Sequence, residues 1–285
     1  MKYIDLHIHT KASDGGLSPT QVVELAIKKG MKAIAITDHD TVSGIPEALL
    51  ACENKPIQLV QGIELSCHEP GLKGTIDVLG LFIDYQSKSF VDFIQRCRND
   101  RVAEKQEMIR KLNALGYAIT FEELKDASGE SLGRPGIARL LIEKYPEEFM
   151  MVSDVFDRLL GEGKAAYVHR KKTNIKEAID IIHEAKGVTV LAHPGRYKDY
   201  TRVIDVFVRS GGEGIETDYP YGKILGIDSS KSARLNMELC AIAHRRNLLM
   251  SGGSDFHDFK RKSELGDGGV NDEEFDQLSQ GILRP

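Results

Sequence analysis

The chain has 285 residues, 41% of them hydrophobic and 28% charged, which is the balance of an ordinary folded domain with a sizeable core. Its formal net charge of −5 argues against the broad basic surface that binding of extended duplex nucleic acid requires. No apolar run approaches the roughly 20 residues of a membrane span, and the start MKYIDLHIH lacks a signal-peptide core, so we expect a cytoplasmic protein with no membrane partner. The four cysteines show no CxxC spacing, so we expect neither a disulfide framework nor a zinc ribbon.

The first predicted elements are a strand and a helix. Over residues 4–9, apolar side chains alternate with polar ones, which is the period-two pattern of a strand, so His7 and His9 should point the same way. A helix is predicted after Ser18, an N-cap residue that is followed by proline. A lone histidine is most often structural, but a histidine pair with Asp14 five residues later indicates the start of a metal site.

Strands and helices then alternate along most of the chain. Short apolar runs predict further strands within residues 32–40, 57–65, 76–84, 188–194, 213–218 and 247–255. Helical patterns stand between most of them, such as the one over residues 175–187. This alternation is typical of βαβ units, so we expect an α/β fold with a largely parallel sheet.

Residues 89–165 interrupt the alternation. They show helical periodicity and no convincing strand, and Thr120 with Glu123 fits the capping box of a helix over 121–128. We expect residues 89–165 to form a small helical insertion that covers the mouth of the active site. Residues 1–88 and 166–285 would then form one barrel domain.

Ionisable side chains cluster where the predicted strands end. They are His7, His9, Asp14, Asp38, His39, Asp40, Glu64, His193, Asp255 and His257. In a parallel α/β barrel the carboxyl ends of the strands form one face, where active sites are built. Imidazole and carboxylate ligands together suit zinc, manganese or iron, and Glu64 is the best candidate to bridge two ions. Asp38 is a candidate to orient a histidine ligand rather than to bind metal.

Five segments carry a resemblance to a known family. DLHIHTKASDG, TDHDT, GIELS, AHPGR and GSDFH resemble successive motifs of the polymerase and histidinol phosphatase (PHP) superfamily, from residue 3 to residue 257. Their spacing is most similar to the stand-alone phosphoesterases that include nucleoside 3',5'-bisphosphate phosphatases. The resemblance implies a distorted (β/α)7 barrel of PHP type that holds two or three divalent ions.

The resemblance also implies a ligand set. One ion would be held by His7, His9, Glu64 and Asp255, a second by Glu64 and His193, and a third by Asp14, His39 and His257. Asp77, in TIDVLG, stands where this branch usually has histidine. We expect Asp77 to bind metal in preference to the nearby His68, and its oxygen ligand to favour manganese or iron over zinc.

The ligands and two arginines indicate phosphate ester hydrolysis. Clustered cations lower the pKa of a water to about 7 and bind phosphoryl oxygens. Glu64, Arg134 and Arg196 are the candidate catalytic residues, and the two arginines are placed in motifs suited to binding phosphate. We therefore expect a metal-dependent phosphoesterase that acts on a small phosphorylated metabolite: a nucleotide, a nucleoside bisphosphate or a sugar phosphate.

Three alternatives stay open at this point. The same metals could open a cyclic phosphodiester and then release phosphate, or serve a 5'-3' exonuclease that trims short oligonucleotides. A metal-binding module without catalysis is the non-enzymatic alternative, against which the nearly complete ligand set argues. The oligomeric state is also open.

Overall fold

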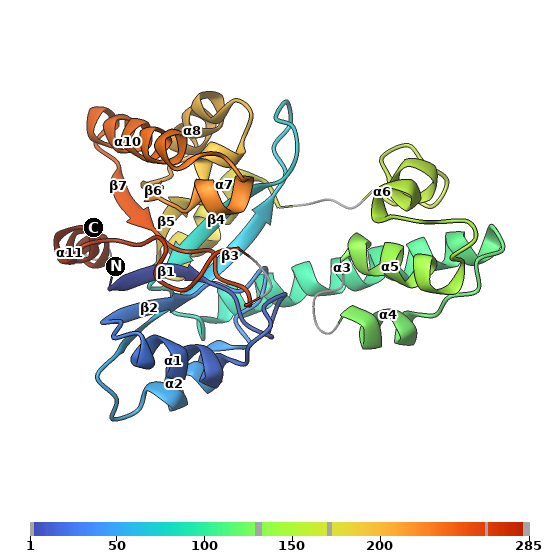
Figure 1. Cartoon of the computed structure of the whole chain (residues 1–285), viewed down its shortest axis with the longest axis horizontal. Coiled ribbons are helices and arrows are strands. Elements are labelled where there is room, and N and C mark those ends of the chain that lie inside the picture. The colour runs from blue at the N-terminus through green and yellow to red at the C-terminus, as the bar shows by residue number, and fades with distance from the viewer. Residues whose placement is uncertain (1–2, 129–132, 170–172, 260–261, 282–285) are drawn as a thin grey trace. The chain divides into compact units, whose positions relative to one another are not determined.

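One curled sheet of seven strands organises the main part of the molecule (Figure 1). In the computed structural model, which describes residues 3–128, 133–169, 173–259 and 262–281, the strands lie side by side in chain order. They are β1 (Ile4–Ile8), β2 (Ala33–Ile36), β3 (Gln58–Cys67), β4 (Ile76–Leu81), β5 (Val188–Leu191), β6 (Gly214–Asp218) and β7 (Leu249–Gly252). The chain divides into two compact units: residues 1–94 with 172–285, which contain the sheet, and residues 95–171.

The fourth strand runs against its neighbours. β1, β2 and β3 are parallel, as are β5, β6 and β7, but β4 pairs antiparallel with both β3 and β5. The sheet is therefore largely parallel, as predicted, and β4 is the exception. The physical reason is chain length: only residues 68–75 join β3 to β4, and a parallel return needs a crossover of about a dozen residues or more.

The two edges of the sheet meet beyond the last strand. The Asp255 N–H donates to the His7 carbonyl oxygen over 2.9 Å, and the His9 N–H donates to the Phe256 carbonyl oxygen over 2.9 Å. The segment after β7 therefore runs beside β1, and the sheet curls into a half-barrel. The carboxyl ends of the parallel strands share one rim, which holds the cluster described below.

Seven α-helices, from both the N-terminal and the C-terminal part of the chain, belong to the described part of the unit that contains the sheet. They are α1 (Pro19–Lys28), α2 (Ile45–Cys52), α7 (Ile175–Glu184), α8 (Tyr200–Arg209), α9 (Tyr221–Leu225), α10 (Ser229–Arg246) and α11 (Asp272–Gly281). α1 begins after Ser18, whose side chain accepts the Gln21 N–H as part of a capping box, which confirms the predicted start. α7 packs against β3, β4 and β5, and α10 packs against β6 and β7.

Two hydrophobic clusters lie on opposite faces of the sheet. Ala33 and Ala35 of β2 belong to an inner cluster that α11 completes with Phe275. Ile34 and Ile36, the alternate residues of the same strand, pack with α1 in a second cluster.

β1 departs from strict alternation. Leu6 belongs to the inner cluster, but Ile8, two residues later, packs with α1 in the other one. The register between β1 and β2 shifts between Asp5 and Ile8, which accounts for the change of face. An irregularity of this kind changes the direction of side chains, and here it falls near His7, the first of the predicted metal ligands.

Residues 95–171 form a helical unit with its own core. Its helices are α3 (Lys88–Ala114, which starts before the unit does), α4 (Phe121–Ser128), α5 (Arg134–Lys144), α6 (Val152–Val155) and the π-helix η1 (Phe156–Leu160). Buried residues such as Leu112 and Leu141 pack together in it. The predicted capping box is present, because the Thr120 N–H donates to Glu123 Oε2 over 2.8 Å and the Glu123 N–H donates to Thr120 Oγ1 over 3.2 Å.

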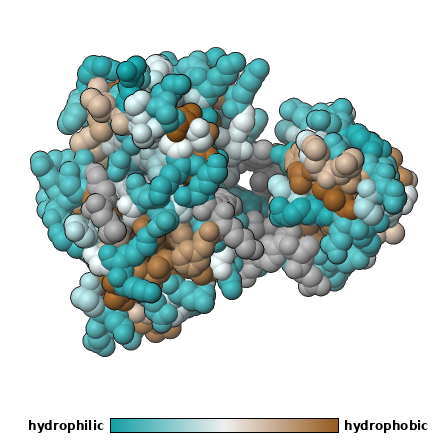
Figure 2. Space-filling model, in the orientation of Figure 1, coloured by the Kyte–Doolittle hydropathy of each residue, from teal (hydrophilic) through white to brown (hydrophobic). Residues whose placement is uncertain are grey.

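The face of the molecule shown in Figure 2 is mostly hydrophilic. Large hydrophobic side chains such as Leu50 and Met150 are exposed in places. Within the described residues, no helix is both long and apolar enough to cross a membrane, and even the 27-residue α3 is rich in charged side chains.

Candidate metal centre

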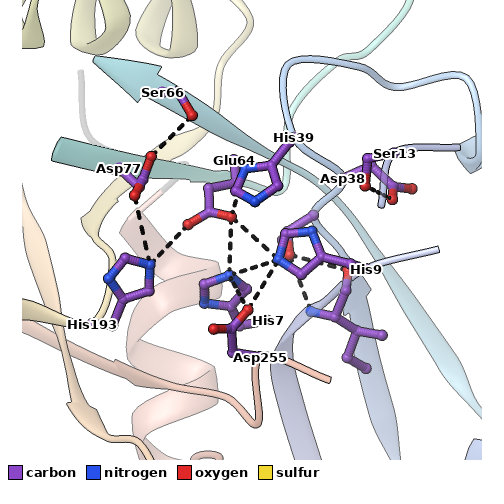
Figure 3. Close-up of polar contacts among 12 residues, drawn as sticks. His7, His9, Ser13, Asp38, His39, Glu64, Ser66, Asp77, His193 and Asp255 are labelled. Carbon is purple, nitrogen blue, oxygen red and sulfur yellow. Dashed lines mark hydrogen bonds and ion pairs between the residues drawn. The ribbon is translucent and has the colours of Figure 1, made fainter. Parts of the chain in front are cut away.

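Two histidines from β1 and its continuation start the cluster at the rim (Figure 3). His7 Nε2 and His9 Nε2 lie 3.1 Å apart, and both side chains are fully buried. Asp255, from the segment after β7, brings its Oδ1 atom to 3.2 Å from His9 Nε2 and 3.6 Å from His7 Nε2. Closure of the sheet therefore places a carboxylate oxygen beside two imidazole nitrogens.

Glu64 lies at the middle of the cluster. Its Oε2 atom is 3.3 Å from His7 Nε2, 3.2 Å from His9 Nε2 and 3.1 Å from His39 Nδ1. Its other oxygen, Oε1, is 3.1 Å from His193 Nε2. The backbone explains the position of His39, because the pairing of β2 with β3 continues beyond Ile36 as a parallel bridge between His39 and Glu64.

A further set of side chains lies around His257. Its Nε2 atom is 3.3 Å from Asp14 Oδ1, and the same oxygen is 3.8 Å from His9 Nδ1. The rings of His9 and His257 stack with their centroids 4.1 Å apart. His9 therefore presents one ring nitrogen to Glu64 and Asp255 and the other to Asp14.

The donor atoms form four overlapping groups that could each hold an ion. The groups are His9 with Asp14, His39 and His257; His7 with Glu64 and His193; His7 with His9 and Asp255; and His39 with Glu64 and Asp77. Within each group the atoms lie within 4.8 Å of one another. Ligand atoms about 2.1 Å from one tetrahedral ion lie about 3.4 Å apart, close to the separations around Glu64 and Asp255.

The buried polar atoms test whether these residues fit metal ions. His9 Nδ1 and Glu64 Oε2 are buried and make no hydrogen bond of good geometry with any described residue. Buried polar atoms are normally satisfied, so their presence here indicates a missing partner. Imidazole and carboxylate groups that face one another at these distances fit several divalent cations. The structure thus brings all nine predicted ligands together, and their assignment to particular ions stays a prediction.

The charges of the cluster follow the pattern expected where cations bind. Burial alone would raise the pKa of Glu64, but the imidazoles of His39 and His7 lower that pKa well below its usual range. Burial alone would lower the pKa of His9, but the neighbouring carboxylates of Asp255 and Glu64 raise it to about 10. The carboxylates therefore create a negative field that holds positive charge at this point, and divalent ions would supply that charge.

Two residues of the cluster have left-handed backbone conformations. His193 has φ 32° and Asp255 has φ 52°. Such conformations cost non-glycine residues about 1–3 kcal/mol and occur where the surroundings impose them, often at functional sites. His193 is the second residue after β5 and Asp255 the third after β7, where the chain turns at the rim.

Asp77 reaches the cluster because β4 is antiparallel. Asp77 is the second residue of β4. Because β4 is antiparallel to β3, the amino end of β4 lies beside the carboxyl end of β3, and Asp77 pairs with Ser66. Asp77 Oδ2 is 3.8 Å from His193 Nε2, and Asp77 Oδ1 accepts a hydrogen bond from Ser66 Oγ over 3.0 Å. Burial and then the Glu64 carboxylate raise the pKa of Asp77. His68, in contrast, is exposed and belongs to none of the four groups.

Comparison with known proteins identifies the family. The PHP domain model matches residues 5–190. The chain belongs to the PHP domain family. It is 33% identical over 262 residues to the 5'-3' exoribonuclease of Haemophilus influenzae, with 90% of each chain covered. It is 32% identical over 264 residues to the 3',5'-nucleoside bisphosphate phosphatase of Chromobacterium violaceum, with 90% of this chain and 88% of that protein covered.

A solved structure agrees with this family. An amidohydrolase from Chromobacterium violaceum, with bound sulfate and no metal, superposes with a TM-score of 0.76 at 30% identity, over 99% of this chain and 98% of that one. The predicted resemblance and the PHP-type α/β fold are therefore confirmed. The protein is a metal-dependent phosphoesterase of the PHP family.

Of the two predicted phosphate-binding arginines, one lies beside the nine predicted metal ligands, which we call the PHP centre. Arg196 ends the 3-10 turn η2 (Pro194–Arg196), and its Nη1 atom is 3.5 Å from Asp255 Oδ2, with 43% of the side chain exposed. Arg134 belongs to the other unit, in the first turn of α5, with its guanidinium 5.9 Å from the ring centroids of Phe156 and Tyr167. Contact of Arg134 with phosphate stays a prediction.

The sequence patterns did not single out Glu216, in β6, and Tyr219, just after β6, which contact predicted metal ligands. Glu216 Oε1 lies 3.1 Å from His7 Nδ1, and Glu216 Oε2 accepts the His193 N–H over 2.5 Å. The Tyr219 hydroxyl donates to Asp255 Oδ2 over 2.7 Å. One signal was available for Glu216: a carboxylate inside a buried strand needs a buried partner.

The prediction that Asp38 orients a histidine is wrong. Its Oδ1 atom accepts the Thr10 N–H over 2.7 Å and the Ser13 hydroxyl over 2.5 Å, and its Oδ2 atom accepts the Thr10 hydroxyl over 2.7 Å (Figure 3). Asp38 therefore fixes the loop that leads from His9 to Asp14. It positions ligands of the PHP centre through the backbone rather than through an imidazole.

Proposed function

We propose that this PHP protein hydrolyses a terminal phosphate ester of a small nucleotide, of the nucleoside bisphosphate type. The observation that carries the proposal is the sharing of Glu64, whose two oxygens lie 3.1–3.3 Å from nitrogen atoms of four histidines. When bound, adjacent divalent ions lower the pKa of a water to about 7 and neutralise phosphoryl oxygens. Glu64, which belongs to two of the candidate groups, would supply an oxygen ligand to two of them.

The proposal includes two or three ions, with manganese or iron favoured over zinc. Asp77 with Glu64 and His39 gives a group of two carboxylates and one imidazole, whereas the group of His7, Glu64 and His193 has two imidazoles. Oxygen-rich donor sets suit manganese better than zinc. The donor chemistry of Asp77 therefore supports the choice of metal.

Two arginines would bind the phosphate. The guanidinium of Arg196 lies beside Asp255 and is partly exposed, so a planar, bidentate contact with phosphoryl oxygens can form from the rim. Arg134, at the first turn of α5, would add a second contact supported by that helix terminus. In this proposal the helical unit restricts access by long substrates.

An exonuclease that trims short oligonucleotides is the second candidate, favoured by the similarity to an exoribonuclease. Both reactions break a phosphate ester, and they differ in how much nucleic acid must be bound. Binding of a longer single strand uses a basic groove with stacking aromatic side chains. The chain carries a net charge of −5 and has no tryptophan, which supports the smaller substrate.

A substrate panel tests the proposal. Protein loaded with Mn²⁺, Fe²⁺ or Zn²⁺ would be assayed on nucleoside monophosphates, 3',5'-bisphosphates, sugar phosphates, cyclic phosphodiesters and 5'-phosphorylated oligonucleotides. We expect the highest kcat/KM on a 3',5'-bisphosphate with Mn²⁺ or Fe²⁺. Arg196→Ala should lower that value about 100-fold or more, since a charge-assisted contact to phosphate is lost.

Arg209→Ala is the matched control, because Arg209 is an exposed arginine in the last turn of α8. It should leave kcat/KM unchanged. A higher kcat/KM on oligonucleotides would establish the exonuclease, and a higher value on cyclic esters would establish a phosphodiesterase. Metal-loaded protein that releases phosphate from none of these compounds would refute the proposed function.

A further inference from the structure

β6 supplies none of the nine predicted ligands, but Glu216 at its centre contacts two of them. Glu216 Oε1 lies 3.1 Å from His7 Nδ1, and Glu216 Oε2 accepts the His193 N–H over 2.5 Å. Its side chain is fully buried. A buried carboxylate is costly unless its oxygens are paired. Both oxygens of Glu216 are paired, and both partners belong to the metal centre.

The contact with His7 determines where the imidazole carries its proton. A carboxylate can only accept hydrogen bonds, so the proton between Glu216 and His7 sits on His7 Nδ1. A neutral imidazole has one such proton, which leaves a lone pair on Nε2. Nε2 is the atom that lies 3.1 Å from His9 Nε2 and 3.3 Å from Glu64 Oε2. Glu216 therefore presents the lone pair of His7 to the cluster.

The contact with His193 determines a backbone conformation. His193 has φ 32°, an unfavourable value for a residue with a side chain, and Glu216 holds its N–H in that turn. The turn places His193 Nε2 3.1 Å from Glu64 Oε1. One carboxylate thus orients a ligand from β1 and a ligand that follows β5.

We propose that Glu216 is a positioning residue that controls occupancy of the ion positions to which His7 and His193 contribute. The inference rests on the proposed function, since it assumes that the centre binds ions. His7 belongs to two of the four groups, one with Glu64 and His193 and one with His9 and Asp255. The other two groups, His9 with Asp14, His39 and His257, and His39 with Glu64 and Asp77, contain neither of the residues that Glu216 holds, and they share His39. Loss of Glu216 should weaken binding at the two His7 positions and spare an ion held through His39.

Glu216→Gln tests this with nearly the same side-chain shape. If the amide oxygen accepts the His193 N–H, the amide NH₂ must donate to His7 Nδ1, which moves the imidazole proton to Nε2 and removes the lone pair. If the amide is turned over, its NH₂ meets the His193 N–H and the turn loses its acceptor. Either orientation disturbs a ligand, so we expect weaker binding of Mn²⁺ at the His7 positions by about 10–100-fold.

The readouts are bound Mn²⁺ per chain and the electron paramagnetic resonance spectrum, neither of which depends on turnover. Wild type should show several ions and the broad spectrum of coupled Mn²⁺, and E216Q should retain one ion with an isolated six-line spectrum. Thr217→Val is the matched control, since Thr217 is the buried neighbour on β6 whose hydroxyl donates to the Ser251 carbonyl oxygen over 3.3 Å. T217V should keep the wild-type spectrum and number of ions.

Each outcome of these measurements decides the inference. E216Q with the wild-type number of ions would overturn the inference alone, and so would equal loss of ions in E216Q and T217V. Wild type that binds no Mn²⁺ would overturn the proposed function together with it. If E216Q does not fold, Glu216→Asp, which keeps the carboxylate on a shorter side chain, replaces it: weaker Mn²⁺ binding than wild type supports the inference, and equal binding overturns it.

Discussion

Asp255 shows how one carboxylate can serve the ligand cluster and its surroundings at the same time. Its Oδ1 atom faces His9 and His7, while its Oδ2 atom accepts the Tyr219 hydroxyl over 2.7 Å and lies 3.5 Å from Arg196 Nη1. Because one oxygen is held from outside the cluster, the other is fixed in direction. Preorganisation of this kind decides how well a metal site binds.

Tyr219→Phe removes the hydroxyl that holds Asp255 and keeps the buried ring. We expect the affinity for Mn²⁺, measured by isothermal titration calorimetry, to fall about 10-fold while the fold is retained. Tyr200→Phe is the control, since the Tyr200 hydroxyl bonds to Glu238, away from the cluster. An unchanged affinity in Y219F would show that Arg196 and the backbone suffice to orient Asp255.

At this scale the ligands were predictable and the residues that hold them were not. His193 and Asp255 each follow a short apolar run and His7 lies near the end of the first predicted strand, so strand prediction places them at one rim. A carboxylate in a buried strand signals that Glu216 has a buried partner but not which one, because the partners of Glu216 and Tyr219 depend on contacts between strands that are distant in sequence. Their roles require the actual distances between side chains.

At the scale of elements, the approach of α7 to β4 depends on a residue without a side chain. A Cβ atom at Gly80 would lie 2.9 Å from Ile182 Cγ1, closer than carbon atoms pack. Gly80 thus lets Ile182 fill the space between α7 and the sheet. This packing supports β4, the strand that carries Asp77 to the rim.

Gly80→Ala should therefore destabilise the protein by about 1–3 kcal/mol through overpacking, as measured by urea unfolding. Ile182→Ala alone should cost about 2–5 kcal/mol because it leaves a cavity. In the double variant the new methyl group fills part of that cavity, so the two costs should sum to more than the measured loss by about 1 kcal/mol. Additive costs would contradict this account of the contact.

The elements themselves followed from periodicity, but their directions did not. Strands were correctly predicted within residues 57–65 and 76–84, but an apolar run does not indicate whether the strand is parallel to its neighbour. The shortness of the connection over residues 68–75 was the available signal. Because β4 is antiparallel to its neighbours, its amino end, with Asp77, lies at a rim that is otherwise formed by the carboxyl ends of strands.

At the scale of the whole molecule, the centre joins residues from both ends of the chain. His7 lies in the first strand and His9 directly follows it, and Asp255 and His257 come after the last strand. Ions bound between them connect segments that only the folded protein brings together. Such binding stabilises the folded state by mass action.

Mn²⁺ at 100 times its dissociation constant should therefore stabilise the protein by about 2.7 kcal/mol. For a chain of 285 residues that corresponds to a rise in Tm of roughly 5 °C, measurable by differential scanning calorimetry with EDTA-treated protein as reference. His9→Ala removes a ligand common to two groups and should lose most of the rise. The same rise in H9A would place the stabilising ion elsewhere.

The order of the strands has a consequence for the way the protein is made. Because each strand pairs with the one synthesised just before it, the sheet can grow by local steps as the chain emerges. The exception is the junction of Ile8 with Phe256 and of Ile4 with Val270, which closes the longest loop in the molecule and must wait for the last strand. Asp255 and His257 arrive with that junction, so a nascent chain holds an incomplete ligand set until it has closed. We therefore expect the full complement of ions to bind only after this junction has closed, so that a truncated chain would bind fewer of them.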